Sequence, residues 1–529
     1  MTITIAVSGA AAAAVDRVVP TLVDDLVASG ITAQVPTLWG PEAEPGAARR
    51  LGWTETVATS AGLLDEIERL RDELRERGLD HVVLVGTGGA VSLAEAMTRT
   101  SGVDLTVLDT SSSGSLRHAL ADRLERTVLV VSSPSGLALA TSRVMAAYEA
   151  AFRAAGLDPA DRVVLVTDPG SPLEHEARSS GRVVFLADET VGGPFSGLTA
   201  HGLVPAGLAG ADVRELLAEA DAVSLELAQD GAANPGLVLG AVLAGTQPLR
   251  DTIAVVPDGT HVLGLGEWIQ QLVAAAVGSD GRGLLPLVVG PSAAEVVRPP
   301  SDVQVVRLVA DAEETREVVD GEVEISASFG GHVVLWQYAV TVAARLLGVD
   351  PFTEPALGAP ETAVRPLLAV PSPVAPGRLL AEGIVGSASG SELGSSVGQA
   401  LEALLATLPE HGHVAVHSYG DRTATPRLHE LRDAIAERTG RPVALLQGLR
   451  GLRGASPEVG DGADRGVSLQ VVDASSPDLE VPGESFTFGE LTAAQAAADA
   501  ELLARRGRAV LTLVLDDPSA FTLVLDALR

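Results

Sequence analysis

The run HVVLVGTGGAVSLAEA (81–96) joins a continuous apolar segment to a glycine-rich turn and then to a helical pattern. TVLVVSSPSGLALAT (127–141) repeats this arrangement with serines in the turn. Further valine-rich runs lie at LTVLD (105–109), RVVLVTD (162–168) and RVVFLAD (182–188). Continuous apolar runs that alternate with helical patterns are typical of buried parallel strands. This region therefore predicts a doubly wound sheet of about five parallel strands with right-handed crossover helices.

The same alternation recurs twice farther along the chain. TIAVVPD (252–258) and VQVVRLVAD (303–311) indicate a second sheet, and HVAVHSY (413–419) begins a third group of strands and helices. We expect an α/β protein with two doubly wound parallel-sheet domains and a smaller C-terminal α/β unit. The expected divisions are an N-terminal segment (1–60), a first domain (61–205), a second domain (206–350), a Pro-, Gly- and Ser-rich linker or wrapping segment (351–396) and the C-terminal unit (397–529).

Composition excludes several classes of function. The chain has 529 residues and a formal net charge of −32, which repels nucleic acid and anionic lipid, so we expect neither as a partner. It has no Cys, which excludes thiolate nucleophiles and Cys-ligated zinc. It has no Lys, which excludes Schiff-base chemistry. The N-terminus does not resemble a signal peptide, and no apolar run reaches the ~18–20 residues that a membrane span needs, so we expect a cytoplasmic protein.

The two turns that follow 81–86 and 127–131 carry the groups suited to an anion. In open parallel sheets, ligands bind at the carboxyl ends of strands where strand order reverses. Gly88 and Gly89 allow backbone N–H groups to approach an anion at a helix N-terminus. Ser133, Ser135 and Thr141 add hydroxyl donors. Each turn alone has an equally good structural explanation, since glycines serve helix–strand packing and serines cap helices.

In this order and spacing, the two turns resemble those of sugar isomerase (SIS) domains, and specifically of glucose-6-phosphate isomerases. TDPGSPLEHEAR (167–178), VGGPFSGLTAHGLVPAGLAGADV (191–213) and LLGVDPFTEP (346–355) continue the resemblance in order. VPGESFTFGELTAAQAAADAELLARRGRAVLTL (481–513) resembles the C-terminal part of the bacterial form that is fused behind transaldolase. The resemblance covers most of the chain.

The resemblance implies a fold and an activity. It implies two SIS-type domains, a homodimer, a phosphosugar ligand and a place in glycolysis and gluconeogenesis. The implied reaction interconverts glucose 6-phosphate and fructose 6-phosphate through an enediol, without cofactor or metal. Such a reaction needs a carboxylate base, a group that opens the ring, a cation near the enediolate and a phosphate anchor.

Several positions depart from the family pattern. Pro194 stands where the family has an Arg, Ala275 where it has the Glu, and Pro134 where it has the phosphate-loop Lys. Ala138 and Ala90 replace a Thr and a Ser of the phosphate site. The alternative interpretation is therefore a pseudoenzyme, a lapsed isomerase that binds a sugar phosphate or regulates a pentose-phosphate enzyme. A third interpretation, an SIS isomerase for another phosphosugar, fits less well because the resemblance is specific to one branch.

Substitute catalytic residues are Asp280 and Arg282, in the turn beside the lost Glu, and His332, at the start of a helix. His201 and Glu267 are weaker candidates, because a lone His is more often structural and an acid at a helix start complements the dipole.

A metal site is conceivable at His411, His413 and His417, which share one side of a strand at H-x-H spacing, but no carboxylate ligand accompanies them. We therefore predict no metal.

Overall fold

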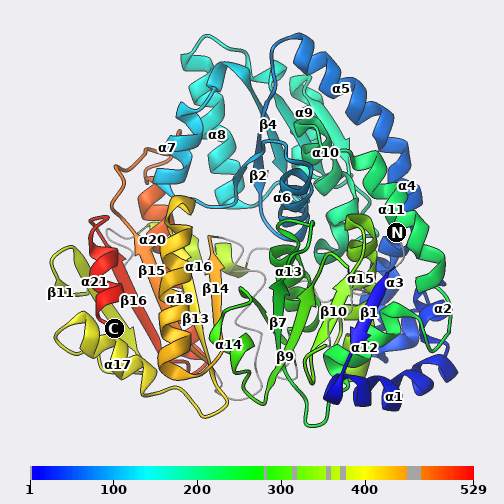
Figure 1. Ribbon diagram of the computed structural model, residues 1–529. Helices are drawn as coiled ribbons and strands as arrows, with labels where there is room; N and C mark the ends of the chain where they lie inside the picture. The colour runs from blue at the N-terminus through cyan, green and yellow to red at the C-terminus, as the bar shows by residue number, and fades with distance from the viewer. Residues whose placement is uncertain (1–2, 279–282, 312–317, 353–358, 370–376, 449–465) are drawn as a thin grey trace.

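The strands of this protein form three sheets, seen in a computed structural model that describes residues 3–278, 283–311, 318–352, 359–369, 377–448 and 466–529. Figure 1 shows the first sheet (blue to cyan) above the second (green), with the C-terminal sheet (yellow to red) beside the second. The fold class is the predicted one, α/β with mostly parallel sheets. The domain limits given above stay predictions.

The first sheet is five-stranded and entirely parallel, in the order β3-β2-β4-β5-β6. β2 and β4 are buried along their whole length, as their valine-rich sequences predict. The strands are β2 (His81–Gly86), β3 (Thr106–Leu108), β4 (Thr127–Ser132), β5 (Val163–Thr167) and β6 (Val183–Leu186). The helices that follow the first four are α6 (Gly89–Ser101), α7 (Ser113–Ala121), α8 (Leu139–Ala154) and α9 (Pro172–Ser180).

The second sheet has the order β1-β10-β9-β7-β8, and only β1 runs antiparallel to its neighbour. The strands are β1 (Thr4–Val7), β7 (Thr252–Pro257), β8 (Leu285–Val288), β9 (Val303–Leu308) and β10 (Val323–Ser326). Helix α15 is buried from Phe329 to Ala344 because α11, α12 and α13 pack around it. These helices are α1 (Gly9–Asp24), α11 (Val213–Leu227), α12 (Pro235–Ala244), α13 (Leu265–Val277) and α15 (Phe329–Leu347).

The C-terminal sheet is six-stranded, in the order β11-β12-β16-β15-β13-β14. Its first two strands form an antiparallel hairpin inside the segment 351–396, which we expected to be a linker or wrapping segment. The hairpin turns at Gly383, whose φ is +72°, and its glycine- and serine-rich sequence hides the strand pattern. The strands are β11 (Arg378–Ala381), β12 (Ile384–Ser389), β13 (His413–Tyr419), β14 (Val443–Gln447), β15 (Gly466–Asp473) and β16 (Val510–Leu515). The helices are α17 (Val397–Leu405), α18 (Thr425–Thr439), α20 (Phe488–Arg505) and α21 (Ala520–Asp526).

Apolar and polar contacts join the three sheets and the helices packed on them. One hydrophobic core runs through the first two sheets' helices, where Trp53 stacks on Phe195 with ring centroids 5.2 Å apart. A buried ion pair between Glu295 of α14 and Arg432 of α18 joins the region of the second sheet to the C-terminal unit. The other helices are α2 (Val27–Thr32), α3 (Glu44–Arg50), α4 (Thr56–Ser60), α5 (Leu64–Glu76), α10 (Ala200–Ala209), α14 (Ala294–Val297) and α16 (Ala359–Leu368). Within the described residues, no helix is long and apolar enough to cross a membrane.

Candidate functional site

The strand order of the first sheet reverses between β2 and β4, which makes the carboxyl ends of these strands the switch point. Gly86 and Ser132, the last residues of the two strands, are paired in the sheet. The glycine turn and the serine turn therefore start side by side, as the sequence predicted. Figure 1 shows α6 and α8 leaving this edge of the sheet.

The helices at the switch point differ from their neighbours in how they begin. Neither α6, after Gly88, nor α8, after Ala138, has a side-chain hydrogen bond at its N-cap. By contrast, Ser112 caps α7 and Ser171 caps α9 through their side chains. The first N–H groups of a helix have no partner within the helix, and they attract anions when no side chain caps them. Among the four helices that follow β2 to β5, the two without a side-chain cap are thus the two that flank the switch point.

The glycine turn is shaped for close approach. Gly88 has φ +96°, and a Cβ added there would meet no atom within 4 Å, so the backbone faces open space. Gly89 begins α6, and a Cβ there would lie 3.2 Å from the carbonyl oxygen of Pro194. The first glycine is required by backbone conformation, and the second makes a close contact with the turn η6 (Gly193–Leu198).

The serine turn is held by its own hydroxyls. The backbone N–H of Gly136 donates to Ser133 Oγ at 3.1 Å, and that of Leu137 donates to Ser135 Oγ at 3.2 Å. Accepting these bonds uses oxygen lone pairs and leaves each hydroxyl proton for a further partner. Ser133 is only 4% exposed, whereas Ser135 is half-buried. Thr141 lies in the first turn of α8 and is buried.

His201 connects the serine turn to the neighbouring strand, a link that we did not infer from the sequence. Its Nδ1 lies 2.9 Å from Ser132 Oγ, and its Nε2 lies 3.3 Å from Asp168 Oδ1. Asp168 in turn donates its backbone N–H to the carbonyl of Pro134 at 3.0 Å. The histidine is itself buried at the start of α10. No short spacing signals this contact, because Ser132 and His201 are 69 residues apart.

The substitute catalytic residues are not gathered at this turn by the described structure. His332 lies in α15 with no exposed surface, and neither ring nitrogen has a hydrogen-bond partner. Burial, with a smaller contribution from the charge of His261, lowers its pKa from 6.5 to about 3, so the ring is neutral near pH 7. Asp280 and Arg282 lie outside the described residues. The catalytic and phosphate-binding assignments stay predictions.

Two of the positions that depart from the family pattern, Pro194 and Ala275, lie on elements that contact α6. Pro194 belongs to η6 and Ala275 to α13, and α6, α13 and η6 contact one another. Pro194 has no side-chain donor or acceptor and Ala275 has only a methyl group, so neither can move a proton or hold a charge.

In the described part of the chain, no three His, Cys, Asp or Glu side chains lie together in a way that could hold a metal ion. His413 and His417 lie on β13, but His411 lies in a turn before the strand, so the three histidines do not share one strand as expected. Burial lowers the pKa of His417 to about 4. A neutral imidazole can bind a metal, but no third ligand accompanies these two among the described residues.

Comparison with known proteins gives the same class of fold. The structure resembles a crystal structure of a hypothetical protein from Thermus thermophilus, with a TM-score of 0.58 and 20% identity over 69% of this chain and 100% of that chain. In sequence, the chain is 32% identical over 213 residues to a protein named as a probable glucose-6-phosphate isomerase of Haloarcula marismortui. It is 29% identical over 256 residues to a glucose-6-phosphate isomerase of Rippkaea orientalis. No family model matches the chain.

These alignments are partial. They cover 39% of this chain and 49% of the Haloarcula protein, and 46% and 48% for the Rippkaea protein, so the chain spans about half the length of the curated relatives it matches. The chain thus shares an α/β fold with the Thermus protein. Over part of its length, its sequence is similar to proteins named glucose-6-phosphate isomerase.

Proposed function

We propose that this protein binds a hexose 6-phosphate at the switch point of its first sheet and interconverts glucose 6-phosphate and fructose 6-phosphate. The observation that supports binding most strongly is the pair of uncapped helices, α6 and α8, at neighbouring strand ends. The N–H groups of their first turns and the hydroxyl protons of Ser133 and Ser135 are the proposed donors for the oxygens of a phosphate. These local donors offset the repulsion expected from the net charge of −32.

The relatives support the choice of sugar. The curated relatives compared above bear the name glucose-6-phosphate isomerase, and in this reaction a proton passes between two adjacent carbons. Asp280 and Arg282, which follow α13 in the sequence, are the proposed acid–base and charge-stabilising groups. Because His332 is buried and neutral, we assign it no direct part in the proposed proton transfer.

A second candidate function is binding without turnover, and one observation favours it. Pro194 and Ala275 lie on the elements packed against α6, where the resemblance implies a cation and a carboxylate base. Loss of a well-placed general base costs about 10²–10⁴ in rate. Such a phosphosugar sensor, derived from an isomerase, would keep the phosphate-binding turns and lack the groups that transfer the proton.

One experiment separates the two functions. Purified protein is mixed with fructose 6-phosphate, glucose 6-phosphate is followed through a coupled dehydrogenase, and melting temperature is measured with and without ligand. Turnover supports the isomerase, whereas a ligand-induced rise in melting temperature without turnover supports the sensor. Absence of both refutes the proposal.

A pair of serine variants locates the site. Ser133→Ala with Ser135→Ala removes two hydroxyl donors and is expected to weaken binding of fructose 6-phosphate at least tenfold. Ser180→Ala, an exposed serine at the end of α9 whose hydroxyl bonds only to its own helix, is the control and leaves binding unchanged.

The resemblance also implies a homodimer in the cytoplasm, and we propose this assembly for the present chain. Light scattering coupled to size-exclusion chromatography tests it directly. A mass of about 108 kDa, twice the 54.0 kDa of one chain, is expected, and a monomer mass contradicts the assembly.

A further inference from the structure

A cavity of about 520 Å³ lies among the helices of the second sheet, apart from the switch point of the first sheet. It is bounded by the second half of α1, the turn η1 (Pro36–Trp39) and the C-terminal end of α15. None of its lining residues belongs to the first sheet or to the glycine and serine turns. Cavities of roughly 300–1,000 Å³ are the usual size for small-molecule sites.

The walls of this cavity are largely apolar and fixed in place. Val18, Leu22, Leu38 and Leu346 line it, together with the indole of Trp39. Trp39 Nε1 donates to the carbonyl of Thr341 at 2.8 Å, and its ring meets Phe352 edge to face with centroids 5.0 Å apart. A preformed apolar wall binds an apolar ligand surface without the loss of entropy that ordering would require.

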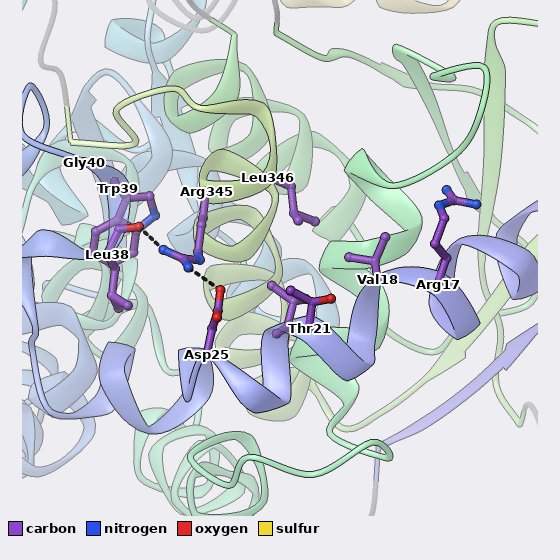
Figure 2. A pocket seen from close by; sticks show the side chains of 10 residues that line it. Arg17, Val18, Thr21, Asp25, Leu38, Trp39, Gly40, Arg345 and Leu346 are labelled. Carbon is purple, nitrogen blue, oxygen red and sulfur yellow. Dashed lines mark hydrogen bonds and ion pairs between the residues drawn. The ribbon is translucent and has the colours of Figure 1, made fainter.

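Two guanidinium groups stand at opposite ends of the cavity, with Val18, Thr21 and Leu346 between them (Figure 2). Arg345 donates to the carbonyl of Leu38 and to Asp25 Oδ2, the latter at 2.7 Å, so its charge is compensated.

Arg17 differs from Arg345 in its partners. It donates to the carbonyl of Gly245, and among the described residues it forms no ion pair with a carboxylate. The side chain is exposed, as is the hydroxyl-bearing Thr21 one helical turn farther on. A positive charge without a carboxylate partner at the rim of an apolar cavity favours a ligand with a negative group.

We propose that this cavity is a second ligand site, which binds a small organic acid with an aromatic or aliphatic body and places the acid group at Arg17. A phosphosugar suits the cavity poorly, because its many hydroxyls would lose their water against Val18, Leu22 and Leu346. The site is therefore independent of the phosphosugar site proposed for the first sheet.

The probe for this proposal is 8-anilino-1-naphthalenesulfonate, an aromatic acid whose fluorescence rises in apolar surroundings. We expect saturable binding of one equivalent to the full-length protein. Arg17→Gln is expected to weaken binding about tenfold, because it removes a charge-assisted contact. Thr21→Trp, a change at an exposed position of α1, fills the cavity and is expected to abolish this binding.

Matched controls are available elsewhere on the surface. Arg69→Gln, at an exposed arginine of α5, and Thr59→Trp, at an exposed threonine of α4, leave binding unchanged if the cavity is the site. Circular dichroism confirms that each variant is folded. Equal binding by wild type and both cavity variants overturns the proposal, and so does displacement of the probe by fructose 6-phosphate, which would place it at the switch point.

Discussion

The buried imidazole of His332 makes a prediction about stability against pH. His332 lies inside α15, has no exposed surface and lacks a partner for either ring nitrogen. We consider the change His332→Leu, which keeps a side chain of similar size and removes the titrating group. At pH 7.5 the variant should be at least as stable as wild type, because an unsatisfied buried polar group costs about 1–3 kcal/mol.

The magnitude follows from the shift in pKa. Burial lowers the pKa of His332 from 6.5 to about 3 in the folded state. Between these values the unfolded chain binds a proton that the folded chain does not, so stability falls as pH drops below 6.5 and continues to fall toward 3. From pH 7.5 to pH 5 the wild type should lose about 2 kcal/mol that His332→Leu does not lose.

The assay compares denaturant unfolding midpoints of wild type and variant at pH 7.5 and pH 5. Other buried histidines titrate equally in both proteins, so their contributions cancel in the difference. His429→Leu makes the same chemical change at an exposed position of α18 and serves as the control. Parallel pH profiles for wild type and His332→Leu would refute the reasoning.

Three further changes test other parts of the account. Gly88→Ala should destabilise the protein by about 1 kcal/mol because φ is +96°, and it should weaken fructose 6-phosphate binding because the strained backbone would shift the N–H groups of the glycine turn; calorimetric titration measures the binding. Asp499 has its pKa raised by burial from 3.8 to about 7, so wild type should lose about 2–3 kcal/mol between pH 5 and pH 8 as the carboxyl ionises, whereas Asp499→Asn should not; the same unfolding assay would contradict this if the two profiles ran parallel. Pro194→Arg combined with Ala275→Glu should raise isomerase turnover at least tenfold if the phosphate-binding turns are intact, and no change in the coupled assay would show that more than these two groups is missing.

Much of the first sheet could be predicted from the sequence, since its strands are continuous apolar runs. The run 81–86 is β2, and the apolar run that begins at 127 forms β4 as far as 132, because buried parallel strands need apolar side chains on both faces. The turns after them could also be identified, since glycine and serine mark a change from strand to helix.

Other features carry no local signal. Strand β1 pairs with β10 across more than 300 residues, and a pairing of that separation leaves no mark on either segment. The hairpin β11–β12 lies in a stretch whose glycines and serines indicate irregular structure. In both cases the strand is specified by its neighbour in the fold rather than by its own pattern.

Part of the candidate site could be predicted from the sequence, because its turns follow strands that the sequence identifies. Gly88 and Ser133 follow from the strand ends, but the absence of side-chain caps at α6 and α8 appears only once the helix starts are known. His332 was named as a candidate because it lies at the start of a helix. The helix that contains it is apolar on all sides, a pattern that predicts burial and that outweighs the position of the residue.

The most direct measurement is a crystal structure of the protein with fructose 6-phosphate. We predict that the phosphate lies against the first turns of α6 and α8, with its oxygens about 2.7–3.1 Å from the backbone nitrogen of Gly89 and from Ser133 Oγ. A phosphate bound at any other place, with this turn empty at saturating ligand, would contradict the account.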